Sequence, residues 1–268
     1  MRALLRSFAI PVMNFRFALL VSVALCTIAS PGCERPDPAA ELSRRGEEAL
    51  VAKKWVEAVS HFEEALRLNR RSVKALAGLA SAHEASGDLL AAALDLERAL
   101  DVNADDTELR LRLIELRLEL NEPEEAAAQL QVVGDKIPEA ERLLLQGRIQ
   151  DMQGDLAAAI STLRKVTETE PGSDAGWYYY GMSLARANDH AGARDAFSKA
   201  IRSDVFQARA YWRRSLAYQQ LGQRELAEQD RRKAAQLDPR LTFADSALGA
   251  QVLESLSGSN QALSPAQQ

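Results

Sequence analysis

The chain has 268 residues, of which 47% are hydrophobic and 26% are charged, and its formal net charge is −5 at pH 7. This balance is typical of a soluble helical protein, and it lacks the strong positive charge that binding to nucleic acid requires. With only 14 glycines and 9 prolines, most of the chain can form regular structure.

The first segment, residues 1–32, has the features of a signal peptide. An uncharged apolar run from Phe17 to Ser30 follows three arginines, and small residues come directly after it. A short apolar core behind positive charge is typical of secretory signals, with either Met1 or Met13 as the starting residue. At ~1.5 Å per residue this run spans about 21 Å as a helix, less than the ~30 Å hydrocarbon layer of a membrane. We therefore expect a cleaved signal rather than a permanent transmembrane anchor.

Cys33 follows the signal segment directly and resembles the acylated cysteine of bacterial lipoproteins. Gly32 is small, as that motif requires, and the only other cysteine, Cys26, lies inside the apolar run. The resemblance implies lipidation of Cys33 and a short tether at residues 33–38. The protein would then be an exported lipoprotein of the cell envelope, anchored to a membrane on the periplasmic side; Glu34 favours the outer membrane. The alternative is plain secretion with a free thiol.

A unit of about 34 residues recurs six times between Ala39 and Leu241. In the fifth copy the pattern reads Trp177-x2-Tyr180-Gly181-x2-Leu184, followed by Ala193-x3-Phe197 and Ala200. These residues resemble the tetratricopeptide repeat, in which each unit is a pair of antiparallel helices. The resemblance implies an all-α fold, a right-handed superhelical solenoid of about six helix hairpins. Its copies would begin near residues 39, 73, 107, 140, 174 and 208, with one register slip within residues 134–138.

Small residues recur wherever two helices of a unit would cross closely. In the first helix they are Gly46, Ala80, Gly147, Gly181 and Ser215, and in the second helix Ala58, Ala92, Ala126, Ala159, Ala193 and Ala227. Bulky residues recur at one position of the second helix, namely Phe62, Leu96, Leu130, Leu163 and Phe197. Because larger side chains would push the helix axes beyond about 8–10 Å, these columns predict tightly packed hairpins.

Turn residues fall in the same register as the small residues. The pairs between the two helices of a unit are Gly87-Asp88, Gly154-Asp155, Asn188-Asp189 and Gly222-Gln223. Glycine and asparagine tolerate the left-handed conformation that ends a helix, and aspartate caps the next helix. Pro171 and Pro239 follow second helices, where a missing N–H ends the helical ladder.

Two copies depart from the repeat pattern. The third has Arg110, Ile114 and Arg117 where the family prefers aromatic or small residues, and the sixth has Arg231 in place of a large apolar residue. After the sixth copy, residues 242–256 predict a capping helix. The tail at 257–268 is rich in Ser, Gln, Gly and Asn, a composition typical of disorder.

Catalytic chemistry finds little support in the sequence. His83-Glu84 begins like a zinc-protease motif, but no second histidine follows at the required helical spacing. His83 and His190 instead fill positions that bulky packing residues usually occupy. The sequence has no glycine-rich phosphate loop, and its acidic runs fall at helix starts, where carboxylates act as caps. We therefore predict no catalytic residue, no cofactor and no metal site, and the protein is not expected to be an enzyme.

In the family that the repeats resemble, the first helix of each repeat lines a concave groove that holds a peptide or a helix. Residues 39–138 hold 20 acidic and 13 basic residues, whereas residues 139–241 hold 14 acidic and 16 basic ones. Arginine and aromatic side chains are frequent interface anchors. The predicted groove residues are Arg148, Tyr178, Met182, Arg186, Arg209, Trp212 and Arg213. Alternatively, Tyr178 and Trp212 pack between neighbouring repeats.

The sequence therefore favours a non-catalytic scaffold that is tethered to a membrane by an N-terminal lipid and binds a protein or an extended peptide. It predicts neither a nucleic-acid partner nor a small-molecule substrate. Ser43 and Glu47 replace the Lys and Asn with which some family members clamp chaperone C-termini, which argues against a co-chaperone role. The alternatives are a secreted or periplasmic adaptor without lipid and, more distantly, an accessory subunit of a separate enzyme.

Overall fold

The computed structural model describes residues 37–202, 204–239 and 241, and within them the fold is all-α, as predicted. Six first helices alternate with six second helices, and one 3-10 turn, η1 (Gly134–Lys136), separates the third hairpin from the fourth. The hairpins are α2 (Pro38–Val51) with α3 (Trp55–Leu68), α4 (Val73–Ser86) with α5 (Leu89–Val102), α6 (Thr107–Glu119) with α7 (Pro123–Val133), α8 (Glu139–Met152) with α9 (Leu156–Thr169), α10 (Asp174–Arg186) with α11 (His190–Ala200), and α12 (Asp204–Gln220) with α13 (Arg224–Leu237).

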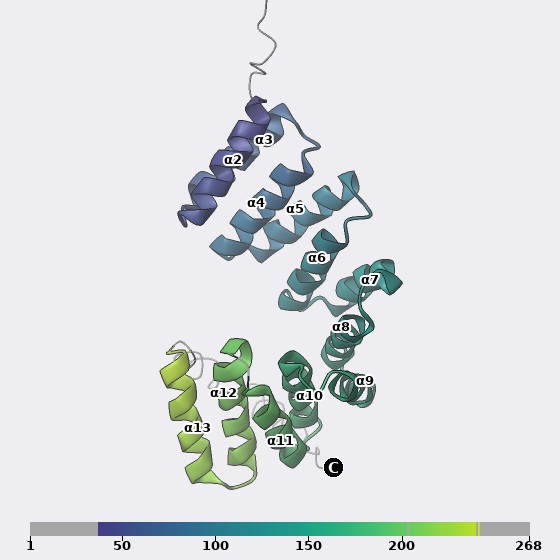
Figure 1. Ribbon diagram of the computed structural model, residues 1–268, viewed down its shortest axis with the longest axis vertical. Coiled ribbons are helices and arrows are strands. Elements are labelled where there is room, and N and C mark those ends of the chain that lie inside the picture. Colours follow the sequence, from purple (N-terminus) through teal and green to yellow (C-terminus); the bar gives the residue numbers. More distant parts are fainter. Residues whose placement is uncertain (1–36, 203, 240, 242–268) are drawn as a thin grey trace, which may run out of the picture.

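The hairpins stack in chain order, each packing on the next (Figure 1). The stack bends, so that the first and last hairpins lie on the left of the view and α7, α8 and α9 lie on the right. First helices also contact each other across neighbouring hairpins, for example α8 with α10 and α10 with α12. The 3-10 turn occupies the segment where the repeat register slips by one residue.

Local turn chemistry explains where the helices end. Gly87, Gly154 and Gly222 have φ values of 88°, 86° and 73°, and Asn188 has a φ of 64°. These are the left-handed conformations that the sequence predicts, in which a non-glycine residue other than asparagine would be strained. After Gly87, Gly154 and Asn188 the next helix starts on an aspartate cap. In one case the Asp155 carboxylate accepts a hydrogen bond of 3.1 Å from the Ala158 N–H.

The small residues lie where helices pack most closely. A Cβ atom added to Gly147 would lie 2.5 Å from Leu163, and one added to Gly181 would lie 2.8 Å from the ring of Phe197. Leu163 and Phe197 are themselves fully buried. The alanine column of the second helices is buried throughout, namely Ala58, Ala92, Ala126, Ala159, Ala193 and Ala227. Most of the buried hydrophobic residues that the structure describes form three clusters along the stack, one from α2 to α6, one from α6 to α8 and one from α10 to α12.

The third hairpin keeps the fold despite its unusual residues because each of them is accommodated. Ile114 is fully buried, and Arg117 forms ion pairs with Glu97 and Glu122. Arg110 donates hydrogen bonds of 2.6 Å to the Gln129 side chain and to a backbone carbonyl.

Several predictions lie outside the described residues. They are the signal peptide at 1–32, lipidation of Cys33, most of the tether at 33–38, the capping helix at 242–256 and the disordered tail at 257–268. In the part of the chain that the structure describes, no helix is both long enough and apolar enough to cross a membrane.

Candidate partner-binding face

Two neighbouring pockets open along the first helices of the last four hairpins. The middle pocket, of about 220 Å³, is lined by Leu118, Glu119, Arg148, Asp151, Met152, Leu163, Tyr179, Met182 and Ser183. The distal pocket, of about 230 Å³, is lined by Met182, Ala185, Arg186, His190, Phe197, Arg213, Leu216, Ala217 and Gln220. Because Met182 lines both pockets, they form one surface that crosses α8, α10 and α12, which we call the inner face.

Contacts with Glu115 and Tyr179 fix the orientation of the Arg148 side chain in the middle pocket. Its guanidinium donates hydrogen bonds of 2.6 and 2.8 Å to the two carboxylate oxygens of Glu115, and its Cζ atom lies 4.4 Å from the ring centroid of Tyr179. Burial is the largest single effect and lowers the pKa of Arg148. The hydrogen bonds to Glu115, together with the electrostatic effects of Tyr179, Glu115 and Glu119, outweigh it and leave the pKa above its usual value. Burial likewise raises the pKa of the Tyr179 hydroxyl, although Arg148 lowers it in part. The site therefore presents a permanent cation and a neutral phenol.

Asp151 fixes the position of Arg186 beside the middle pocket. Its backbone carbonyl accepts a hydrogen bond of 2.6 Å from Arg186, and its Oδ2 atom forms an ion pair with the same guanidinium. The other carboxylate oxygen, Oδ1, is buried and has no hydrogen-bond partner among the described residues. Because that oxygen has almost no exposed surface, the pocket does not present it to a bound molecule.

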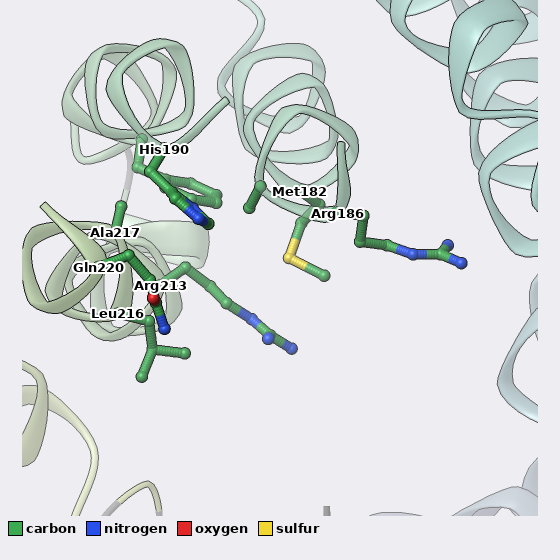
Figure 2. A pocket seen from close by; sticks show the side chains of 9 residues that line it. Met182, Arg186, His190, Arg213, Leu216, Ala217 and Gln220 are labelled. Carbon is green, nitrogen blue, oxygen red and sulfur yellow. The ribbon is translucent and has the colours of Figure 1, made fainter. Parts of the chain in front are cut away.

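The distal pocket combines an apolar floor with two arginines. Figure 2 shows the Met182 side chain between the side chains of Arg186 and Arg213. The Arg213 guanidinium points into open space, whereas the Arg186 guanidinium binds Asp151 on α8. His190 reaches toward the same space from the start of α11. The pocket can thus hold an aliphatic group next to the guanidinium of Arg213.

The predicted groove residues separate into different environments. Arg148, Met182, Arg186 and Arg213 line the two pockets. Arg209 is exposed on α12 but lines neither pocket.

Tyr178 is a correction to the predicted groove. Its side chain is only 7% exposed. Its ring centroid lies 5.9 Å from that of Phe197 and 5.1 Å from that of Phe206. Trp212 is half-buried, and the Arg231 guanidinium lies 5.9 Å from its ring centroid. Trp212 lines neither pocket. Tyr178 therefore matches the packing alternative, because Phe206 belongs to the next hairpin. Trp212 instead contacts Arg231 of its own hairpin.

Sequence reasoning missed several residues of the inner face. Tyr179, His190 and Leu216 line the pockets but were not among the predicted groove residues. The sequence did contain a sign that neighbouring first helices contact each other. Glu115 and Arg148 have opposite charges and are 33 residues apart, which is one repeat length at this point of the chain. Opposite charges at that spacing on first helices predict a contact between neighbouring hairpins.

His83, whose motif begins like a zinc-protease site, lies outside the two pockets. No group of three or more His, Cys, Asp or Glu residues in the described part of the chain is placed to hold a metal ion. His83 contacts Asp95 at 2.8 Å, and Asp95 also accepts a hydrogen bond from Arg98, so this histidine belongs to a packed network between α4 and α5.

Comparison with known proteins decides the family. Models of the tetratricopeptide repeat match residues 44–106 and 144–207, residues 84–149, and residues 208–241. The chain belongs to the tetratricopeptide-repeat family. No curated protein matches this sequence.

Solved structures share the tetratricopeptide-repeat fold at low sequence identity. A tetratricopeptide repeat protein from Parabacteroides merdae is 19% identical, with a TM-score of 0.66 over 76% of this chain and 80% of its own. PilW, a type IV pilus biogenesis factor, is 19% identical, with a TM-score of 0.61 over 75% of this chain and 94% of its own. PilF from Pseudomonas aeruginosa is 15% identical, with a TM-score of 0.57 over 81% and 97%. Proteins of this family are generally non-catalytic and bind other proteins or peptides, which is consistent with an interaction scaffold.

Proposed function

We propose that this protein is a non-catalytic scaffold of the bacterial cell envelope that binds a segment of a partner protein against its inner face. The observation that carries the proposal is the pair of adjoining pockets, which offer apolar floors and arginines on one continuous surface. Concave sites with mostly apolar walls and a few convergent polar groups are typical of binding sites. The chain itself contributes shape and charge rather than reacting groups.

We further propose that an acylated Cys33 tethers the scaffold to a membrane. The support is the apolar run, the small residue before the cysteine and the position of that cysteine only a few residues before α2. A single acyl chain binds a membrane only marginally, so stable anchoring requires more than one chain on the mature N-terminus. The first hairpin would then lie close to the membrane.

A photo-reactive residue placed at Met182 in living cells tests partner binding. We expect discrete adducts with one or a few proteins, because Met182 lines both pockets. The matched control is the same residue placed at Lys233, which is exposed on the second helix α13. Equal patterns of adducts at the two positions would contradict the proposal.

Mass spectrometry of the mature N-terminus tests the tether. The expected result is a chain that begins at Cys33 and carries the mass of the lipid. A chain that begins near this position without lipid would instead support the secreted or periplasmic adaptor, and an intact residue 1–32 segment would contradict both.

A further inference from the structure

Ion pairs join the first helices α4, α6, α8 and α10 each to the preceding first helix. In every step from the first to the fifth hairpin, the cation lies on the later helix and the acceptor on the earlier one. The pairs are Lys74 with Glu47 at 3.0 Å, Arg112 with Glu84 at 3.0 Å, Arg148 with Glu115 at 2.6 Å, and Arg186 with Asp151. In each of these four pairs, a carboxylate of the preceding first helix therefore compensates the positive charge.

The series stops at the last step, from α12 to α10. Here α12 carries Arg209 and Arg213, but the α10 residues that line the pocket beside Arg213 are Met182, Ala185 and Arg186. Within the described ranges, no carboxylate forms an ion pair with Arg209 or Arg213. The third arginine of α12, Arg214, pairs with Asp230.

The two unpaired cations also repel each other. Arg209 and Arg213 are four residues apart on one helix and so lie on the same side of it, where like charges are destabilising. The nearby Arg186 adds a third positive charge, although Asp151 compensates it. An external carboxylate would remove this repulsion and would complete the pattern of the earlier steps.

The surroundings of Arg213 show what should accompany that carboxylate. Met182, Leu216, Ala217 and Phe197 form an apolar floor next to the guanidinium. In Figure 2 the Arg213 side chain extends past Leu216 into the open space in front of Met182. A carboxylate at this position can accept two hydrogen bonds from one guanidinium, while a neighbouring aliphatic side chain fills the floor.

We propose that the distal pocket selects an acidic segment of the partner, one in which an Asp or Glu side chain binds Arg213 and an adjacent aliphatic side chain occupies the apolar floor. This inference rests on the proposed function, since it names the chemistry of the segment that the inner face would bind. Neighbouring first helices are about 8–10 Å apart, and an extended chain advances ~3.3 Å per residue, so about three residues separate the groups bound at successive hairpins.

Selection from a library of random peptides displays this preference directly. The full-length chain in detergent, its Arg213→Glu variant and its Lys233→Glu variant are each used to recover binding peptides. We expect the unaltered chain to enrich Asp or Glu next to Leu, Ile or Met. Arg213→Glu should lose that enrichment, and Lys233→Glu should keep it, although both substitutions change the net charge by the same amount.

Affinities of one recovered peptide then give the size of the effect. An arginine that anchors a bound carboxylate accounts for a large share of binding, so Arg213→Glu and Arg213→Gln should both raise the Kd about tenfold or more. Lys233→Glu should change the Kd by less than about twofold, because this exposed side chain lies on a second helix. Circular dichroism checks that every variant keeps its helical content.

The possible failures can be told apart. Peptides that bind the unaltered chain without acidic enrichment, or that bind Arg213→Glu equally well, would overturn the acidic preference while the scaffold proposal stands. Failure to recover peptides with any of the three proteins, together with the absence of specific adducts at Met182, would overturn the proposed function and this inference with it.

Discussion

At the scale of single residues, Gly147 determines how closely α8 approaches α9. Its missing side chain leaves room for Leu163, which would otherwise meet a Cβ atom at 2.5 Å. The same relation holds between Gly46 and Phe62 in the first hairpin, where the distance would be 2.7 Å. Small residues at these positions therefore serve packing rather than flexibility.

Gly147→Ala should destabilise the protein for this reason. Overpacking a core typically costs about 1–3 kcal/mol, which exceeds the gain of about 1 kcal/mol or less that alanine brings to a helix. Chemical denaturation measures the difference, and Gly172→Ala is the control, since no atom lies within 4 Å of a Cβ added there. Equal stabilities of the two variants would contradict the close approach.

Tyr178→Ala should also destabilise the fold, by about 3 kcal/mol, because it removes a buried ring from the cluster with Phe197 and Phe206. Tyr178→Phe should change the free energy of unfolding by less than about 0.5 kcal/mol, since the ring makes these contacts. Thermal unfolding of both variants checks the assignment. If Tyr178→Ala instead lost partner binding at full stability, Tyr178 would belong to the inner face after all.

The error over Tyr178 has a physical cause. Residues 177–180 are four consecutive aromatic residues, so hydrophobicity alone does not show which of them is buried. Successive residues on a helix differ by about 100° in direction, so which of Tyr178 and Tyr179 is buried depends on how α10 is rotated about its axis. Side-chain direction within such a run depends on the neighbouring hairpins, which only the structure provides.

At the scale of elements, helix boundaries follow local chemistry and were therefore predictable. The left-handed turn residues and the aspartate caps act within a few residues, so the sequence contains everything that specifies them. Left-handed conformations at Lys53 and Asn121 were not predicted. Lysine carries no such preference, and Asn121 is not followed by the aspartate that marks the other turns.

Asp155→Ala tests the capping contribution. Loss of the hydrogen bond from Asp155 to the start of α9 should destabilise the protein by about 1 kcal/mol. Gln223→Ala is the control, because the Gln223 side chain caps no backbone N–H at the start of α13. Denaturation curves of the two variants should differ, and coincident curves would contradict a capping role.

At the scale of the whole molecule, the repeat period determines the architecture, whereas the site depends on departures from the period. The common positions build the core of every hairpin, and so the all-α solenoid could be predicted from the sequence. The inner face differs from hairpin to hairpin, with Glu115, Arg148, Met182 and Leu216 at equivalent positions along the stack. Which of these residues contact each other depends on how neighbouring hairpins stack. The sequence of a single repeat does not specify that arrangement.

The most direct measurement of the central claim compares two double variants of the full-length chain in binding to a recovered peptide. Met182→Glu with Leu216→Glu places charges on the floor of the distal pocket, whereas Leu94→Glu with Val132→Glu places them on exposed positions of second helices. We predict that the first pair raises the Kd at least about tenfold with helical content unchanged, and that the second pair leaves the Kd within about twofold. Equal effects of the two pairs, or undiminished binding by the first, would contradict binding at the inner face.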